Sequence, residues 1–270
     1  KCNKRGKIDG SVRSGKETEN MVQDLTFKTR ISNHAQDGLY LRGIPLTQLI
    51  EEADFVSTLF LSMVGRKPKA SELKVLNAVL VAAIDHGIEP SSGFVPRVVA
   101  ASGNDILTAM ASSLLALGPY HGGAITACMN VLLETNRLNQ DKEAAAREMI
   151  MHYKELHKRI PGFGHPHYKD EDPRTKQLFD VARAAGLDAT FPNLARIMEN
   201  TLEEVMSRRL VLNIDGAMAA LLLAMDISPI AGNAIFGVAR VAGSIAHIVE
   251  EQTSGEWVSR LAPGSVEVIS

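Results

Sequence analysis

Apolar residues along most of this chain recur at the spacing of an α-helix. Periodic runs of this kind follow one another through residues 45–252, separated by short segments that carry Gly, Pro or Asp. Strand-like alternation is confined to LTFKTRIS at 25–32, GLYLRG at 38–43 and VEVI at 266–269. The pattern therefore predicts a mainly α protein.

Glycines and capping residues set the limits of the predicted helices. One run covers 45–65, and the next is expected to open with Ser71 as its N-cap and to end at Gly87. Two segments, 215–226 and 236–248, are apolar almost all round. Such helices are typical of the inside of a helical body or of a contact with a partner subunit.

Composition narrows the class of protein. The chain has 270 residues, 45% of them hydrophobic, which is enough for one large domain or two modest ones. Its net charge is -2 and it has no basic run, so we expect neither a nucleic-acid partner nor a charged membrane partner. Residues 1–20 have few apolar groups and predict a flexible N-terminal arm.

Cysteine content and hydropathy indicate the compartment. Only Cys2 and Cys128 are present, which excludes a disulfide framework, and Cys128 lies in an apolar helical pattern typical of a buried thiol. The apolar run at 216–225 is well short of the roughly 20 residues that span a bilayer. The first twenty residues are too polar for a secretory signal, although a first residue other than Met leaves a removed leader open. We expect a soluble cytoplasmic protein.

Two histidines stand at the ends of predicted helices. His86 precedes Gly87 at a predicted C-terminus, where an imidazole can simply cap free carbonyl groups. His121 precedes Gly122 and Gly123, which open a helix. A helix N-terminus disfavours an imidazolium, so the ring of His121 is expected to be neutral and able to donate to a developing oxyanion. A loop histidine beside a turn is the alternative interpretation.

The segment 158–182 packs Gly, His, Lys, Asp and Arg between two helical runs. Its PGFG sequence offers flexible backbone with free amides, but no Gly-Lys-Ser/Thr follows, so it is not a P-loop. His165 and His167 have the form of a metal-binding pair, yet no Cys, Asp or further His stands at a supporting spacing. We therefore expect no metal.

The helix after this segment is expected to start with Asp172 as N-cap and Pro173 as first residue. Arg174 then lies in the first turn, where the helix dipole favours anions rather than cations. An Arg in that unfavourable place suggests that it holds a carboxylate ligand. A solvated surface Arg is the ordinary alternative.

Asp215 and Arg240 are the charged groups of the two most apolar segments. As an N-cap Asp215 needs no function, but in a dry pocket its pKa would rise, which suits a carboxyl that moves protons on and off carbon. A lone Arg240 inside an apolar helix has to find an anion or lose several kcal/mol on burial.

Together these positions supply three His, two Arg and one Asp without a metal cluster. Such a set suits a small polycarboxylate that is bound by Arg and worked on by general acids and bases. It does not suit phosphoryl transfer or a serine-type triad, because the chain has neither a P-loop nor a Gly-x-Ser-x-Gly motif.

These motifs also resemble, in the same order and with similar spacing, those of the citrate synthase superfamily. The resemblance covers about residues 36–262 and includes GLYLRGIPLTQLIEEA near the start. The matching motifs are DHG at 85–87, GPYHGGA at 118–124, PGFGH at 161–165, DPRT at 172–175, LNIDG at 212–216 and FGVAR at 236–240.

The resemblance implies a citrate-synthase-like helical fold with a large and a small domain and an active-site cleft between them. We expect residues 21–122 and 235–270 to form the large domain and residues 123–234 the small one. The shared chemistry joins or separates an acyl-CoA and oxaloacetate through an enol of the thioester, without a metal and without a permanently bound cofactor.

The resemblance also assigns catalytic roles. His86 and His165 match histidines that hold the oxaloacetate half of the substrate, and His165 also handles the proton on its hydroxyl or carbonyl oxygen. His121 matches the histidine that stabilises the acetyl-CoA enol. Asp215 matches the carboxylate that moves the proton on the methyl carbon.

Further residues match binding positions of the family. Arg174 and Arg240 match carboxylate-binding arginines, and Phe236 matches the aromatic residue beside them. Arg260 matches an arginine that reaches the site from a neighbouring subunit, and with the apolar helices it predicts a homo-oligomer. The predicted CoA-binding residues are Ile160, Pro161, Gly162, Phe163, Gly164, Lys169, Arg208 and Arg209, the last three chosen by charge and nearness to the motifs.

Within the superfamily the chain looks most like a stand-alone citryl-CoA lyase, related to the lyase module of ATP-citrate lyase. The DHG motif arrives at residue 85, early for a full citrate synthase, and GHPHY departs from the typical synthase sequence. His121 is retained, whereas the ATP-citrate lyase module lacks it. We expect cleavage of citryl-CoA to acetyl-CoA and oxaloacetate; the alternatives are a short citrate or 2-methylcitrate synthase and a catalytically silent relative that binds CoA esters.

Overall fold

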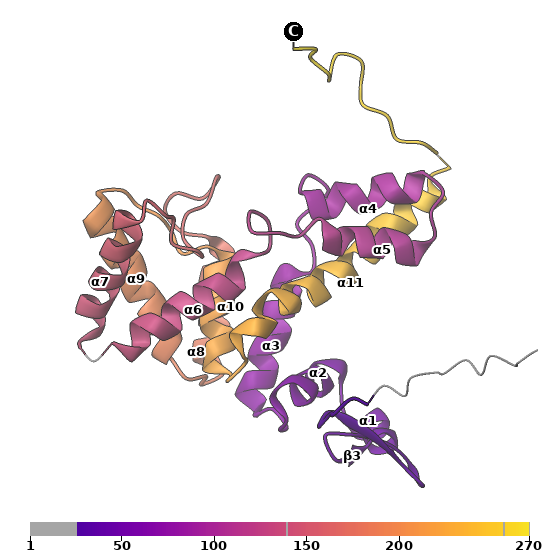
Figure 1. The fold of residues 1–270 in the computed structure, drawn as a ribbon, viewed down its shortest axis with the longest axis horizontal. Helices are drawn as coiled ribbons and strands as arrows, with labels where there is room; N and C mark the ends of the chain where they lie inside the picture. Colours follow the sequence, from indigo (N-terminus) through magenta and orange to yellow (C-terminus); the bar gives the residue numbers. More distant parts are fainter. Residues whose placement is uncertain (1–25, 139, 256, 270) are drawn as a thin grey trace, which may run out of the picture.

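The computed structural model describes residues 26–138, 140–255 and 257–269 (Figure 1). In these residues the chain forms eleven α-helices and one small sheet, so the prediction of a mainly α protein is confirmed. The predicted N-terminal arm, residues 1–20, lies outside the described residues.

The helices follow one another with short connections. The first six are α1 (Leu46–Glu52), α2 (Phe55–Val64), α3 (Ala70–Ala83), α4 (Ser91–Ala101), α5 (Ile106–Leu115) and α6 (Ala124–Arg137). The others are α7 (Lys142–Glu155), α8 (Pro173–Ala184), α9 (Thr190–Met206), α10 (Ile214–Ala224) and α11 (Gly232–Thr253), with the short 3-10 helix η1 (Pro229–Ala231) before α11.

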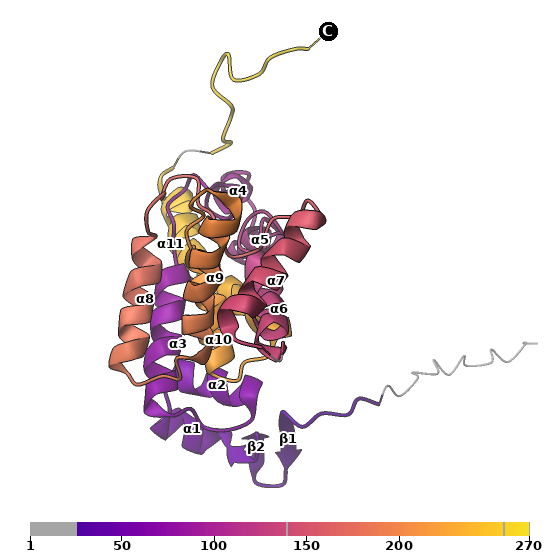
Figure 2. The ribbon, with the colours of Figure 1, turned by 90° about the vertical axis from the view of Figure 1, so that its left-hand side faces the viewer.

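The sheet is a small antiparallel meander beside α1, at the lower end of the molecule in Figure 2. Its strands are β1 (Ser32–Ala35), β2 (Gly38–Leu41) and β3 (Ile44–Pro45). The strand predicted in GLYLRG is therefore correct. Within the described residues, the alternation predicted at 25–32 gives a strand only at Ser32, and 266–269 forms no strand.

Three predicted helix limits are wrong, and side-chain capping explains the first. The run 45–65 is split into α1 and α2 because the carboxylate of Asp54 accepts a hydrogen bond from the Ser57 amide at 2.8 Å and starts a new helix. The N-cap of α3 is Lys69 rather than Ser71.

The end of α3 is the third difference. This helix stops at Ala83, so His86 lies in the following loop and does not cap the helix. The side chain of Arg240 supplies the missing partner, because its Nε donates to the Ala83 carbonyl at 3.2 Å. A carbonyl at the helix terminus is thus satisfied from another helix.

Most of the buried apolar residues form one continuous core. Helices α6 to α10 gather on one side, α4 and α5 on the other, and α3 and α11 run between them (Figure 1). The core draws on α2, α3 and α6 to α11, with fully buried residues such as Phe60, Leu76, Met129, Met198 and Leu221. A second, much smaller cluster of Ala100, Ala109 and Ile248 holds α4 and α5 against α11.

The predicted division into domains follows this arrangement only in part. The predicted large domain contains α1 to α5 and nearly all of α11, and the predicted small domain contains α6 to α10. Helix α11 packs on α3, α4, α5 and α6, and one core runs through both parts. The boundaries 21–122, 123–234 and 235–270 stay a prediction.

Helix α11 is also the one candidate membrane span among the described residues. By length and composition alone, Pro229–Thr253 could cross a bilayer, a test that a core helix of a soluble protein also passes. Its contacts with four other helices are those of a core helix.

Gly243 marks a close approach of α11 to the end of α3. A Cβ at this position would lie 1.9 Å from the Ile84 carbonyl oxygen. We expect Gly243→Ala to lower the free energy of unfolding by about 1–3 kcal/mol, because backbone has to move. Thermal unfolding followed by circular dichroism measures the change. Gly118→Ala, whose Cβ would meet nothing within 4 Å, is the control, and equal midpoints for the two variants would contradict the close contact.

Candidate active site

A cavity of ≈ 910 Å³ lies where the loop after α3, the N-terminal ends of α6, α8 and α10, and the middle of α11 meet. It collects most of the residues that the sequence singles out. The predicted residues that line it are His86, His121, Ile160, Pro161, Gly162, Phe163, Gly164, His165, Arg174, Asp215, Phe236 and Arg240.

Arg240 anchors one wall of this cavity. It is 4% exposed, its Nη1 donates to Ser92 Oγ at 2.7 Å, and its guanidinium carbon lies 4.8 Å from the centre of the Phe236 ring. Burial lowers its pKa, although Asp85 and Asp215 oppose this shift. Among the described residues Nη2 has no hydrogen-bond partner, so these hydrogens are available to an anion in the cavity.

Ser92 transmits this contact to His121. Its fully buried hydroxyl lies 2.8 Å from His121 Nε2 and accepts from Arg240, which can only donate. Among the described residues no other acceptor is within reach of the Ser92 hydroxyl hydrogen, so this hydrogen points to Nε2. His121 therefore carries its own proton on Nδ1. Burial lowers the pKa of His121, and Arg240 adds to this, so the ring is a neutral donor.

His86 lines the cavity from the loop after α3. Burial lowers its pKa, and the charges of Arg174 and Arg240 act in the same direction. The adjacent Asp85 carboxylate bonds His247 Nε2 on α11 at 2.9 Å, which fastens this loop to the helix. A neutral His86 can thus bind a ligand from a loop that is anchored to α11.

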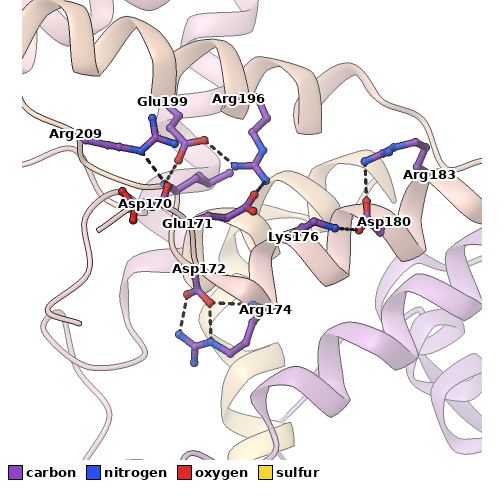
Figure 3. Close-up of polar contacts among 11 residues, drawn as sticks. Asp170, Glu171, Asp172, Arg174, Lys176, Asp180, Arg183, Arg196, Glu199 and Arg209 are labelled. Carbon is purple, nitrogen blue, oxygen red and sulfur yellow. Dashed lines mark hydrogen bonds and ion pairs between the residues drawn. The ribbon is translucent and has the colours of Figure 1, made fainter. Parts of the chain in front are cut away.

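Arg174 is paired with Asp172 in a two-pronged contact (Figure 3). Its Nε and Nη2 donate to Oδ1 and Oδ2 of Asp172 at 3.0 and 2.8 Å. Asp172 also caps α8, as the sequence predicts, by accepting from the Arg174 amide. Burial opposes ionisation of the Asp172 carboxyl, but the bonds to Arg174 outweigh it and hold its pKa below the ordinary value. This fully buried carboxylate explains how a cation is kept in the first turn.

His165 has a defined tautomer. Its Nδ1 accepts from the backbone amides of His167 and Tyr168, both at 3.1 Å, so the neutral ring carries its proton on Nε2. The turn made by Pro166 brings these amides back to the ring, and the Tyr168 ring lies 4.5 Å from it, centre to centre. Burial lowers the pKa of His165, with Asp172 opposing. The structural use of the HPH sequence is to orient His165.

Nε2 of His165 lies 3.4 Å from Arg174 Nη2. Both groups carry hydrogens in the neutral tautomer, so they are poor partners for each other. An acceptor oxygen within hydrogen-bonding distance of both nitrogens satisfies both. This part of the cavity therefore suits a carbonyl, hydroxyl or carboxylate oxygen of a ligand.

The PGFG loop is fastened above a close-packed floor. The Gly162 carbonyl accepts from the Asn213 amide at 3.0 Å, and the Gly164 amide donates to the Val211 carbonyl at 2.7 Å. Gly162 has a φ of 88°, and a Cβ there would lie 2.5 Å from Cys128 Sγ and 2.9 Å from the Gly216 Cα. The loop thus needs glycine, and the buried thiol predicted for Cys128 is confirmed.

Asp215 stands in the first turn of α10 rather than at its N-cap. The cap is Asn213, whose side chain accepts from the Gly216 amide at 3.1 Å. Among the described residues the Asp215 carboxyl makes no hydrogen bond to the protein. Burial raises the pKa of Asp215 to about 6, while Arg174 and Arg240 oppose the rise. This carboxyl can hold or release a proton near neutral pH.

A second cavity, of ≈ 490 Å³, adjoins the first through the loop 159–166. Its cations are Lys154, Lys158, Arg159, Lys169 and Arg208. Arg209 does not line either of these two cavities. Its Nη1 instead donates to Glu203 at 2.7 Å and its Nε to the Asp170 carbonyl at 2.9 Å.

Arg260 lies outside the site of its own chain. It is exposed, in the segment 257–269 that extends away from the helices in Figure 1. Its predicted contribution across a subunit boundary stays a prediction.

Three residues of the site were missed by the sequence reasoning, each because its role depends on distant contacts. Ser92 in PSSG is an ordinary helix-start serine until Arg240 and His121 approach it. Asp172 reads as a cap, and only the fold shows its second pairing. Tyr168 carries no motif of its own. Among the described residues no group of three or more His, Cys, Asp or Glu is arranged to hold a metal ion.

Comparisons with known proteins identify the family of this chain. The family described as "Citrate synthase, C-terminal domain" matches residues 54–261. The putative citrate synthase 2 of Mycobacterium tuberculosis is 28% identical over 229 residues, 82% of this chain and 58% of that protein. This chain thus spans little more than half the length of such curated relatives.

Solved structures share the fold. Citryl-CoA lyase from Hydrogenobacter thermophilus superposes with a TM-score of 0.85 at 34% identity, over 90% of this chain and 94% of that one. ATP citrate lyase from Methanosaeta concilii, in complex with (3S)-citryl-CoA, gives 0.80 at 20% identity, over 100% of this chain and 46% of that one. The predicted helical fold is confirmed.

The raised pKa of Asp215 predicts a pH-dependent effect on stability. Its folded value of about 6 lies above the ordinary 3.8, so the ionised carboxylate destabilises the fold most above pH 6, and the cost disappears as both states become protonated. We expect Asp215→Asn to raise the free energy of unfolding by on the order of 1–3 kcal/mol at neutral pH and by progressively less on acidification. Unfolding midpoints across this pH range test the change. A gain that does not vary with pH would contradict the burial of an ionised group.

Proposed function

Because the chain belongs to the citrate synthase family, we propose that it acts on the carbon–carbon bond between an acyl-CoA and oxaloacetate, as a citryl-CoA lyase. The observation that carries the proposal is Asp215, a carboxyl with a pKa of about 6 in a cavity shared with three histidines and three arginines. These are the groups that proton transfer at the carbon next to a thioester requires.

In the proposed reaction, His165 takes the proton of the tertiary hydroxyl of citryl-CoA on Nε2, in the tautomer that leaves this atom free to accept, and the adjacent carbon–carbon bond breaks. The hydroxyl carbon becomes the carbonyl of oxaloacetate. The electron pair of the broken bond passes to the other fragment, which leaves as the enol or enolate of acetyl-CoA and is protonated on its terminal carbon. No metal or other cofactor takes part.

Asp215 supplies that last proton. Burial keeps a protonated fraction of its carboxyl at neutral pH, and the ionised form left behind faces Arg174 and Arg240. The same group can remove the proton in the reverse direction. Its pKa therefore suits both directions of the reaction.

His121 stabilises the enolate oxygen. Ser92 fixes its Nε2 as acceptor, so Nδ1–H is the donor for the thioester oxygen. Because the ring is neutral, it donates without adding a full charge.

The arginines hold the oxaloacetate half. Arg240 offers Nη2, which is unpaired among the described residues, and Arg174 offers the side of its guanidinium that Asp172 does not occupy. His86 and His165 flank Arg174, with atoms 3.5 and 3.4 Å from its Nη1 and Nη2. Carboxylate and hydroxyl oxygens are the acceptors that this donor set fits.

The loop 160–164 and the smaller cavity are proposed to bind CoA. The loop borders both cavities, so a thioester in the larger one can continue past it into the smaller one. The cations there, among them Lys169 and Arg208, suit CoA phosphates. Arg209 is engaged by Glu203 and is a poorer candidate for this role.

One observation favours a condensing synthase as the second candidate. The resting tautomer of His165 holds its proton on Nε2, ready to donate to the carbonyl oxygen of oxaloacetate as condensation requires. Cleavage has to start from a ring whose Nε2 is free to accept. The likeness to a citryl-CoA lyase over 90% of this chain and 94% of that one favours the lyase.

The two candidates are separated by incubating the purified protein with citryl-CoA and, separately, with acetyl-CoA plus oxaloacetate. We expect rapid release of oxaloacetate from citryl-CoA and negligible thiol release from the second mixture. The reverse outcome would establish the synthase. Asp215→Asn, folded by circular dichroism, is expected to lose activity by at least about 100-fold, and an active variant would overturn the mechanism.

We also propose that the protein is a homo-oligomer in which α5 contacts a second copy. Leu107, Ala111, Leu114 and Leu115 lie on one exposed face of α5, and Leu107 and Leu115 are 70% and 85% exposed. The core beneath, Ala100, Ala109 and Ile248, is small. A second copy on this face would also bring another chain within reach of the segment that carries Arg260.

Light scattering after gel filtration tests the assembly. We expect a particle of at least twice the 29.2 kDa chain mass. The double variant Leu107→Asp, Leu115→Asp should dissociate it with helicity retained, because charges on a buried apolar contact are costly. Ile50→Asp, at a residue 74% exposed on α1, is the control. A wild-type monomer would refute the proposal.

A further inference from the structure

Glu199 is a buried carboxylate that supports the start of α10 from outside the active site. It is 4% exposed on α9. Its Oε1 accepts from the Leu212 amide at 2.7 Å, next to Asn213, the N-cap of α10. The backbone three residues before Asp215 is therefore fixed by a charge-assisted hydrogen bond.

Arg196, one turn earlier on α9, connects this carboxylate to the opposite side of the site (Figure 3). Its Nη1 donates to Glu199 Oε2 at 2.7 Å and its Nη2 to Glu171 Oε1 at 3.0 Å. Its guanidinium carbon lies 5.1 Å from the centre of the Phe179 ring on α8. One planar side chain thus joins α9 to the start of α8.

The segment reached in this way carries the other half of the chemistry. Glu171 directly precedes Asp172, which caps α8 and clamps Arg174. A continuous path of hydrogen bonds and adjacent residues therefore runs from the start of α10 to Arg174. Arg209 runs beside it, from Glu203 on α9 to the Asp170 carbonyl.

We propose that Arg196 and Glu199 are positioning residues that set the distance between the Asp215 carboxyl and the Arg174–His165 side of the cavity. Neither lines the ≈ 910 Å³ cavity, so neither touches a ligand there. Their effect passes through the backbone at Leu212 and through Glu171. The catalytic consequence rests on the proposed function; the geometric one does not.

The Arg196–Glu199 ion pair suits this role because its geometry has little freedom to change. A buried carboxylate that loses its cation is destabilised, so Glu199 keeps its contacts with Arg196 and the Leu212 amide together. Lysine could not replace Arg196, since it lacks the fork that reaches two carboxylates at once.

The kinetic test compares Arg196→Met with Glu199→Gln, which keeps an oxygen for the Leu212 amide. For Arg196→Met we expect kcat to fall on the order of 10- to 100-fold with KM for the CoA ester within about threefold, because a proton donor displaced from its carbon slows the chemical step more than binding. Glu199→Gln should lower kcat in the same direction but by less, because the Leu212 amide keeps its acceptor while the new NH2 group cannot accept from Arg196. Unchanged kcat in Arg196→Met, or a loss carried by KM alone, would overturn the proposal.

Arg147→Met is the matched control. Arg147 on α7 pairs with Glu204 on α9, the helix that also carries Arg196. The variant removes this ion pair, which lies on the surface and away from the site. A fall in kcat as large as that of Arg196→Met would show that any loosening of α9 has this effect, and would also overturn the positioning role.

A second readout needs no activity. The difference in unfolding midpoint between Asp215 and Asp215→Asn is measured against pH in the wild-type and Arg196→Met backgrounds. The groups that face Asp215 are Arg174, Arg240, Asp172 and the Cys128 thiol. If Arg196 holds Asp215 in its buried place, the pH-dependent difference shrinks in Arg196→Met. An unchanged difference refutes the positioning role, whether or not the protein is found to cleave or form citryl-CoA. Failure to find either reaction would refute only the proposed function.

Discussion

The buried guanidinium of Arg240 is the constraint around which the larger cavity is organised. A cation 4% exposed in an apolar helix has to be satisfied by hydrogen bonds, and its partners come from the end of α3 and from Ser92. These contacts join the end of α3 to the start of α4 and set which way the His121 ring is protonated. The Phe236 ring covers the same charge. The same contacts therefore stabilise the fold and set the geometry of the site.

Two carboxyls of the cleft show how environment separates chemical roles. Asp172 is fully buried but meets Arg174 with both oxygens and stays ionised. Asp215 has no such partner among the described residues, and burial raises its pKa to about 6. One group is fixed as a counter-ion and the other is free to exchange a proton. Divergent carboxyl environments of this kind are how acid and base roles are assigned at neutral pH.

The helical class and most residues of the candidate site could be predicted from the sequence, because charged residues within apolar helices are visible as a pattern. Arg240 and Asp215 stand out in this way, and the Asp172–Pro173 start of α8 follows from local capping chemistry. Contacts between distant segments leave no such pattern. The pairing of Arg174, the role of Ser92 and the early end of α3 arise only when three helices meet. The role of the HPH sequence depends on the amides after Pro166, which face His165 only in the folded turn.

The close packing of the residues beneath the PGFG loop limits which residues can replace them in evolution. Gly162, Gly216 and Cys128 touch so closely that a Cβ at Gly162 would lie 2.5 Å from the thiol and one at Gly216 would lie 2.4 Å from the Gly162 carbonyl. The three positions therefore cannot drift independently in size. A bulkier residue at any one of them is acceptable only with a concerted change at another, and position 128 is confined to small side chains as long as the two glycines persist.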